Sequence, residues 1–86
     1  MKVYIATVNS IHNGIEENNI IAASLNYNLV LNAMNTDYLD TIHNLYDFQG
    51  IDYNTSQEDD IYTVRQNAEI YEHYDQWYIK EVEMLE

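Results

Sequence analysis

The chain has 86 residues, no cysteine and no proline, and its 15 acidic and three basic side chains give a formal net charge of −12. We expect a single domain over residues 1–86 with one modest core, and the lack of cysteine excludes disulfides and thiolate zinc sites. The charge disfavours direct binding to nucleic acid or to anionic membranes and favours a basic partner.

The N-terminal part of the chain predicts two strands joined by a turn. Residues 2–8 are rich in β-branched and aromatic side chains, which is typical of a strand. Asn13-Gly14 is a strong turn signal, and the short apolar run at residues 20–25 predicts a second strand, antiparallel to the first. The first five residues lack the pattern of a signal peptide, and no apolar run is long enough to span a membrane, so we expect a cytoplasmic protein.

Residues 27–47 carry the pattern of an amphipathic helix. Apolar side chains recur at steps of three and four residues, which places them on one helical face. Ser24 or Asn26 is suited to cap the N-terminus of this helix, and Gly50 lies where a helix C-terminal glycine is expected. The apolar face consists of Val30, Met34, Tyr38, Ile42 and Leu45.

Residues 57–74 predict a second helix. Ser56 followed by Asp59 resembles a capping box, and from Ile61 onward apolar residues repeat at steps of three and four. For residues 61–64, which are Ile, Tyr, Thr and Val, a strand is the alternative.

The closing segment completes the predicted fold. Residues 77–85 predict a strand with Glu81 and Glu83 on one face. The element order is then β-β-α-α-β. The sequence therefore predicts an α+β fold, a small three-stranded and mostly antiparallel sheet covered on one face by two helices.

The acidic side chains are concentrated in the later part of the chain. Residues 1–36 contain two acids and one lysine, a net charge of −1, whereas residues 37–86 contain the other 13 acids and two basic residues, a net charge of −11. On the predicted elements many of these acids recur at steps of three on helices and two on the last strand, spacings of the same order as phosphates along a nucleic-acid strand. Each acid alone is most simply a solvated surface residue, so the interpretation depends on the pattern. The predicted partner-binding residues are Asp37, Asp40, Asp47, Glu58, Asp59, Asp60, Glu69, Glu72, Asp75, Glu81 and Glu83.

The residues with catalytic potential give no enzyme signature. His12, His43 and His73 lack the spacing of metal ligands and lie among polar residues, which favours surface or capping roles. The sequence has neither a nucleophile-elbow serine nor a glycine-rich phosphate loop. We therefore predict a binding protein that is not an enzyme, with no cofactor and no metal site.

Eight of the nine tyrosines and the single tryptophan divide into two groups. The aromatic residues expected in the core are Tyr38, Tyr71, Trp77 and Tyr78. The others are less easily buried, and some of them suit contacts with a partner protein, including contacts with arginine. The members of this second group are Tyr27, Tyr46, Tyr53, Tyr62 and Tyr74.

Two resemblances add to this interpretation. The segments KVYIATV at residues 2–8, GIEENNIIAASL at 14–25 and WYIKEVEM at 77–84 resemble small phage and bacterial proteins of β-β-α-β plan. Separately, the size, acidity, tyrosine content and lack of cysteine resemble phage-encoded anti-CRISPR or anti-restriction inhibitors that mimic nucleic acid. That resemblance implies a stoichiometric inhibitor in the host cytoplasm that occupies the basic groove of a CRISPR effector or restriction enzyme. The alternative is an acidic adaptor or structural protein, as a monomer or a homodimer, that binds a basic surface unrelated to nucleic acid.

Overall fold

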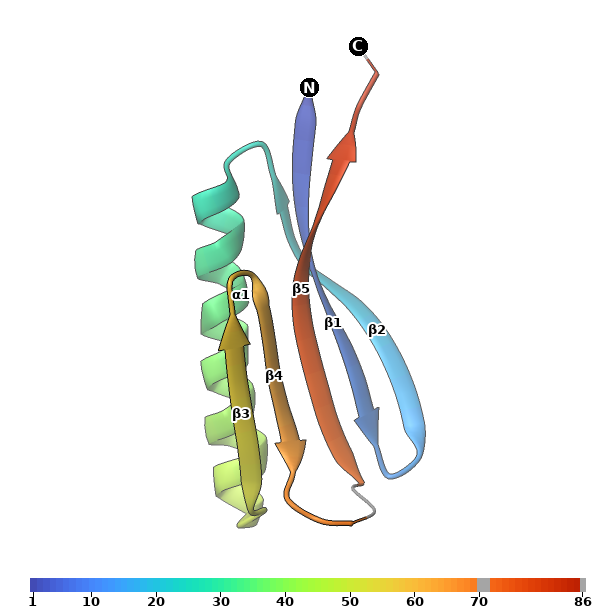
Figure 1. The fold of residues 1–86 in the computed structure, drawn as a ribbon, viewed down its shortest axis with the longest axis vertical. Coiled ribbons are helices and arrows are strands. Elements are labelled where there is room, and N and C mark those ends of the chain that lie inside the picture. Colours follow the sequence, from blue (N-terminus) through green and yellow to red (C-terminus); the bar gives the residue numbers. More distant parts are fainter. Residues whose placement is uncertain (70–71, 86) are drawn as a thin grey trace.

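The computed structural model describes residues 1–69 and 72–85 and contains a five-stranded sheet with one helix packed on it (Figure 1). The strands follow the order β2-β1-β5-β4-β3, and each neighbouring pair is antiparallel. The elements are β1 (Lys2–His12), β2 (Ile15–Ser24), α1 (Tyr27–Thr41), β3 (Tyr53–Glu58), β4 (Ile61–Gln66) and β5 (His73–Glu83). The last turns of the helix, Ile42–Asp47, have π-helical hydrogen bonding.

The predicted first hairpin is confirmed. Asn13 and Gly14 both have positive φ angles, 53° and 82°, as a two-residue hairpin turn requires. His12 pairs directly with Ile15 across this turn. The second strand therefore begins five residues before the predicted apolar run at residue 20, because an edge strand tolerates the exposed polar residues 16–19.

The predicted long helix is also confirmed, together with both of its ends. Asn26 is the N-cap, and its side-chain oxygen accepts hydrogen bonds from the backbone N–H groups of Asn28 and Leu29. At the other end Gly50 has a φ of 68°, and its N–H donates to the Asp47 carbonyl oxygen. The capping residues Asn26 and Gly50 therefore define where this helical segment begins and ends.

The prediction of three strands and two helices is wrong. Residues 57–74 do not form a helix: β3 and β4 form a hairpin that turns at Asp59, whose φ is 51°. The alternative strand at residues 61–64 is confirmed, because alternate residues Tyr62 and Val64 face the helix while Ile61 and Thr63 face away. β5 also begins at His73, before the predicted start at residue 77.

The core lies between α1 and the sheet, and aromatic rings fill most of it. Trp77 is fully buried, packs edge-on against Tyr38 with ring centroids 5.3 Å apart, and donates from Nε1 to Asp37 Oδ2 over 2.7 Å. Tyr46 is also fully buried, so the expectation that it is not easily buried is wrong, and it is not available to a partner. The widened π-helical turn carries Tyr46 into the core and leaves Leu45 half-buried.

Two other aromatic predictions have different outcomes. Tyr78 is only half-buried and lies on the sheet face opposite α1, as its pairing with Thr7 and Ile61 shows. Tyr71 was predicted in the core and lies outside the described residues.

The sheet face opposite α1 has no helix over it among the described residues, and we call it the open face. Strand register assigns to it the odd-numbered residues 3–11 of β1 and 61–65 of β4, the even-numbered residues 74–82 of β5 and 54–58 of β3, and residues 16, 18, 20 and 23 of β2. Its acids are Glu16 and Glu58 and its bases are Arg65 and Lys80, so its net charge is zero. The net charge of −12 therefore lies on the remainder of the molecule.

Candidate functional site

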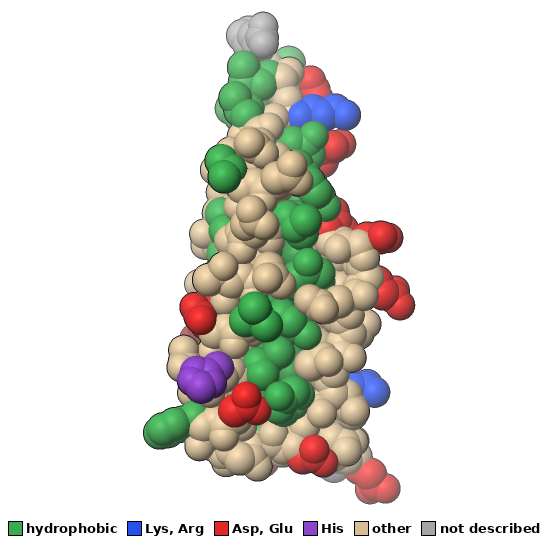
Figure 2. Space-filling model, turned by 90° about the vertical axis from the view of Figure 1, so that its left-hand side faces the viewer, with side chains coloured by type: hydrophobic (Ala, Val, Ile, Leu, Met, Phe, Trp, Pro, Cys, Tyr) green, Lys and Arg blue, Asp and Glu red, His purple; other side chains and the backbone are tan. Residues whose placement is uncertain are grey.

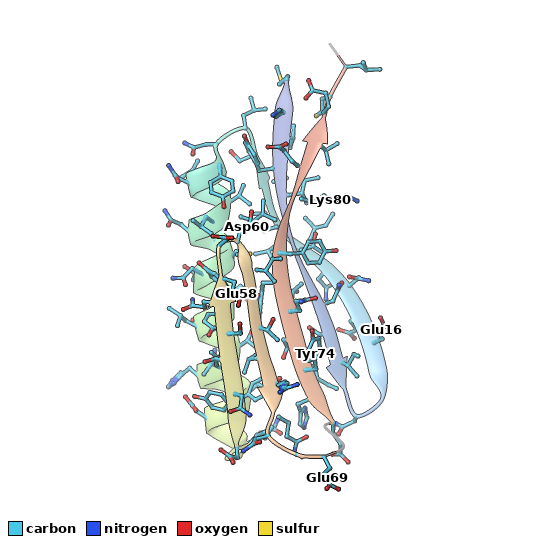
Figure 3. The ribbon with its side chains drawn as sticks, in the orientation of Figure 1. Glu16, Glu58, Asp60, Glu69, Tyr74 and Lys80 are labelled. Atoms are coloured by element: carbon cyan, nitrogen blue, oxygen red, sulfur yellow. The ribbon has the colours of Figure 1, made fainter. Side chains whose placement is uncertain are left out.

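The predicted partner-binding acids separate into several groups in the structure. Glu58, Asp59 and Asp60 come together at the β3–β4 turn (Figure 3). The Tyr27 hydroxyl of α1 donates to Asp60 Oδ2 over 3.3 Å and ties this turn to the helix. Burial and the Asp60 carboxylate raise the pKa of Tyr27, so it remains a hydrogen-bond donor.

A second group lies at the opposite end of the hairpin. Glu69 and Glu72 are exposed in the segment between β4 and β5, and Figure 3 places Glu69 at the end of the molecule far from Glu58. Asp47 is exposed at the end of the helix, where its hydrogen bond with Tyr53 raises the pKa of that tyrosine.

Glu81 and Glu83 form a third group near the C-terminal end of β5. Glu81 Oε2 lies 3.6 Å from Lys2 Nζ, and Glu83 Oε1 lies 3.0 Å from the Met1 amino group. Each side chain in these pairs is about half exposed or more, so each pair contributes only about 0–1 kcal/mol. Their charge is partly balanced, whereas no ion pair is found for the β3–β4 turn acids within the described residues.

The fourth group lines a hollow of about 440 Å³ between α1 and the β1–β2 hairpin, which we call the acidic hollow. Asp37 and Asp40 reach it from one side of the helix, and Glu17 reaches it from β2. Its other lining residues are Ser10, His12, Thr41, Asn44, Leu45 and Asp75. The arrangement suits a cationic group, because several carboxylates converge on one space.

Asp75 was predicted as a helix surface acid, but it lies on β5 and is only 2% exposed. Its carboxylate accepts hydrogen bonds from Ser10 Oγ, from His12 Nε2 over 3.0 Å and from the Tyr46 hydroxyl over 2.9 Å. Three donors offset the cost of burying this carboxylate. Asp75 is therefore the centre of a buried polar cluster and is not available as a surface contact.

The two histidines of this cluster overturn a further prediction. His73 is 8% exposed and His12 is half-buried, so neither is a surface histidine, whereas His43 is exposed as predicted. The Nδ1 atoms of His12 and His73 lie 2.7 Å apart, so a proton lies between them. Because His12 Nε2 donates to Asp75, we assign the proton between the two rings to His73 Nδ1, which donates to His12 Nδ1.

Tyr46 completes the cluster from the helical side. Its hydroxyl also reaches the carbonyl oxygen of Val64, at 3.5 Å. Burial, and then the negative charge of Asp75, raise the pKa of Tyr46 well above its ordinary value near 10. Tyr46 is therefore a neutral donor whose ring fixes the end of the helix against β4 and β5.

The cluster holds its side chains in fixed positions. Ser10 donates its hydroxyl proton to Asp75 and not to a histidine, whereas a nucleophilic serine donates to a histidine base. His73 contacts Nδ1 of the His12 ring and Asp75 contacts Nε2. The polar atoms of the three side chains therefore do not point toward one common site. Across residues 1–69 and 72–85, no group of three or more His, Cys, Asp or Glu residues is placed to hold a metal ion.

A sequence signal for this cluster existed but depended on register. Ser10 and His12 alternate on β1, His73 and Asp75 alternate on β5, and the strands pair them directly: Ser10 with Asp75 and His12 with His73. The prediction of a helix through residue 74 concealed this pairing.

Comparison with protein-family models, with curated proteins and with solved structures gave no match for this chain. Of the helices in the described residues, none has the length and apolar character needed to cross a membrane.

Proposed function

We propose that this protein is a non-enzymatic, stoichiometric inhibitor that occupies the basic groove of a nucleic-acid-binding protein. Its charge density supports this proposal. The molecule is a rod of 46 × 21 × 19 Å, so its net charge of −12 corresponds to one negative charge for about every 3.8 Å of length, close to the roughly 3.4 Å of a nucleic-acid strand. A groove that tracks a phosphate backbone is suited to a rod of this width and charge density.

The exposed acids have two different roles in such a contact, direct binding and long-range steering. Asp59 and Asp60 at the β3–β4 turn have no ion pair within the described residues and are the proposed centre of the interface, with Glu58 beside them at the edge of the open face. Asp40, Glu69 and the other exposed acids steer the approach through the summed field of the molecule. Asp75 is excluded from direct contact by its burial, and Asp37 already holds the Trp77 indole.

The proposed targets are CRISPR effectors and restriction enzymes in the cytoplasm of a bacterial host, following the compositional resemblance. Such nucleases hold DNA or RNA in positively charged channels and recognise the nucleic acid mainly through its backbone. A compact acidic protein would enter such a channel without being cleaved.

A capture-and-competition experiment tests the proposal. The immobilised protein is used to capture partners from bacterial lysates, and each purified partner is then titrated with it in the presence of a fluorescent DNA or RNA ligand. We expect displacement of the nucleic acid at a one-to-one ratio. A partner that retains its nucleic acid at saturating inhibitor would exclude mimicry.

The second candidate function is that of an adaptor for a basic protein surface, and Figure 2 shows the feature that favours it. Hydrophobic side chains gather down the middle of the face that holds the helix, with acidic side chains at its margins. Exposed apolar residues on the helix and just beyond it include Leu29, Leu39 and Phe48, the last 84% exposed. An apolar centre with a charged rim is the usual anatomy of a protein interface. The same competition assay separates the two functions, because an adaptor leaves nucleic-acid binding intact.

A further inference from the structure

The open face combines apolar exposure with a lack of net charge. Ile20 on β2 is 71% exposed and Ile61 on β4 is 46% exposed, and both lie in the row that crosses the sheet through Thr7 and Tyr78. Val3 and Val82 form another pair on this face near the ends of their strands. A sheet face of this composition is usually covered by a second layer.

We propose that a second copy of this chain covers the open face, so that two sheets pack face to face and the two helices lie outside. The distribution of charge favours a second copy as the partner and the open face as the surface that it covers. With two acids and two bases, the open face lets a second copy approach without direct like-charge repulsion. The apolar band beside the helix has acidic margins, so two copies meeting there would repel each other.

The size of the open face fits a stable dimer. It spans three strands of 10 or 11 residues and two strands of six residues. With a rise of about 3.4 Å per residue and strands about 4.8 Å apart, its area is roughly 700 Å². Standard protein interfaces bury about 800 Å² on each partner, and aligned packing of two twisted sheets supplies a known geometry.

Strand register also fixes how the two copies meet. Glu16, Ile11, Tyr74 and Arg65 form one row across β2, β1, β5 and β4, with Glu16 at the outer edge (Figure 3). A two-fold axis along the central strand β5 reverses this row in the second copy. Arg65 of one copy then faces Ile11 of the other across the roughly 10 Å between the sheets, and Glu16 of that copy is displaced sideways by one strand spacing, about 4.8 Å, within reach of the long arginine side chain.

Arg65 has both the freedom and the space for this pairing. Arg65 is exposed, and no ion pair to it is found in the described part of the chain. It lines a hollow of about 280 Å³ with Tyr74, Thr63, Ser56 and two neighbouring residues of β3. None of the described residues that line this hollow carries a carboxylate, so the Glu16 side chain of a second copy supplies the opposite charge.

The test is the molar mass of the full chain in solution at concentrations from about 1 µM to about 1 mM, which covers weak and strong dimers. We expect a concentration-dependent shift from the 10.2 kDa monomer to twice that mass. The paired change Ile20→Lys and Ile61→Lys should shift dissociation to at least tenfold higher concentration. The matched control is Leu29→Lys, which alters a side chain that is 60% exposed on the helix and should leave the dimer intact.

A charge exchange tests the arrangement. Arg65→Glu should weaken the dimer, and adding Glu16→Arg should restore it. A monomer at every concentration, or a paired isoleucine variant that dimerises like the control, would overturn the proposal. Failure of the double exchange to restore the dimer would overturn the axis along β5. Circular dichroism establishes that each variant is folded, and the result is independent of whether nucleic-acid competition is observed.

Discussion

His12 Nδ1 lies 2.7 Å from His73 Nδ1, a contact that holds only while a single proton lies between the two rings. The two residues pair directly in the register of β1 and β5, at the end of the sheet where the first hairpin turns. His12 also donates to Asp75 on its other side. This chain of hydrogen bonds links the hairpin, the central strand and, through Tyr46, the helix.

The first prediction concerns Asp75. Asp75→Asn should destabilise the fold by about 2–4 kcal/mol, because a buried acceptor of three hydrogen bonds is replaced by a group that presents its own N–H donors. For a domain of this size the midpoint of thermal unfolding should fall by about 10 °C or more. Thermal and urea unfolding measure the change, and Asp40→Asn in the exposed part of the acidic hollow is the control. Equal stability of the two variants would contradict the central role of Asp75.

The second prediction concerns Tyr46 and alkaline pH. Burial and Asp75 raise the pKa of Tyr46 in the folded protein, whereas in the unfolded chain the tyrosine ionises near pH 10. The contribution of Tyr46 is therefore fully present below about pH 10 and is lost as pH rises further, because only the unfolded state releases the proton. Urea unfolding from about pH 8 to about pH 11 should show a steeper loss of stability in the native protein than in Tyr46→Phe.

Tyr4→Phe is the control for this pH series, since it removes a hydroxyl from a half-buried ring that packs against Tyr27. That variant should keep the native slope. At neutral pH, Tyr46→Phe should also be less stable by about 1–3 kcal/mol, because Asp75 loses a buried donor. If Tyr46→Phe loses stability with rising pH as steeply as the native protein, other groups cause the loss of stability at alkaline pH.

The third prediction concerns salt. Raising the ionic strength from about 0.01 M to about 0.15 M shortens the screening length from about 30 Å to about 8 Å. The thermal midpoint should rise, because repulsion among charges that sum to −12 is relieved. Association with a basic partner should slow over the same range. Stopped-flow binding and thermal unfolding measure the two effects, and an unchanged association rate would indicate an apolar interface.

Local signals accounted for the parts of the fold that the sequence predicted. The Asn13-Gly14 turn, the Asn26 cap and Gly50 each act through backbone geometry within a few residues, so the first hairpin and the helix followed from them. Residues 57–74 were misassigned because Ile61 and Val64 fit a helical step of three as well as a strand. Pairing of β4 with β5 decides between these, and that contact is not local.

The polar cluster was hidden for the same reason. His12 and His73 are 61 positions apart, and only the register of β1 and β5 brings them together. The acidity of the chain was evident from composition, but the zero net charge of the open face depends on which residues alternate toward the helix. The class of partner inferred from composition stays a prediction, while the arrangement of the acids follows from the fold.

The last prediction identifies the partner-binding surface. The variant carries Asp59→Asn and Asp60→Lys, and Glu58 is left unchanged because it lies on the open face. Asn is chosen at position 59 because the backbone there has a φ of 51°, which asparagine tolerates. If the β3–β4 turn is the centre of the interface, partner affinity should fall at least tenfold, because opposite charges now face a basic groove. A fluorescent nucleic-acid displacement assay measures the loss.

Its control is the pair Asp40→Lys and Asp47→Asn, which changes the charge by +3, as in the test variant, on the helix and not at the turn. Asparagine at position 47 still has a side-chain oxygen that accepts a hydrogen bond from Tyr53. Asp37 is left unchanged because it accepts a hydrogen bond from Trp77. Circular dichroism must show a folded test variant, since Asp60 also accepts a hydrogen bond from Tyr27. A folded turn variant that binds with native affinity would contradict the prediction and would indicate that the partner binds on the helix side. Equal losses in both variants would indicate that the whole acidic surface acts through its summed charge, without a dominant anchor at the turn.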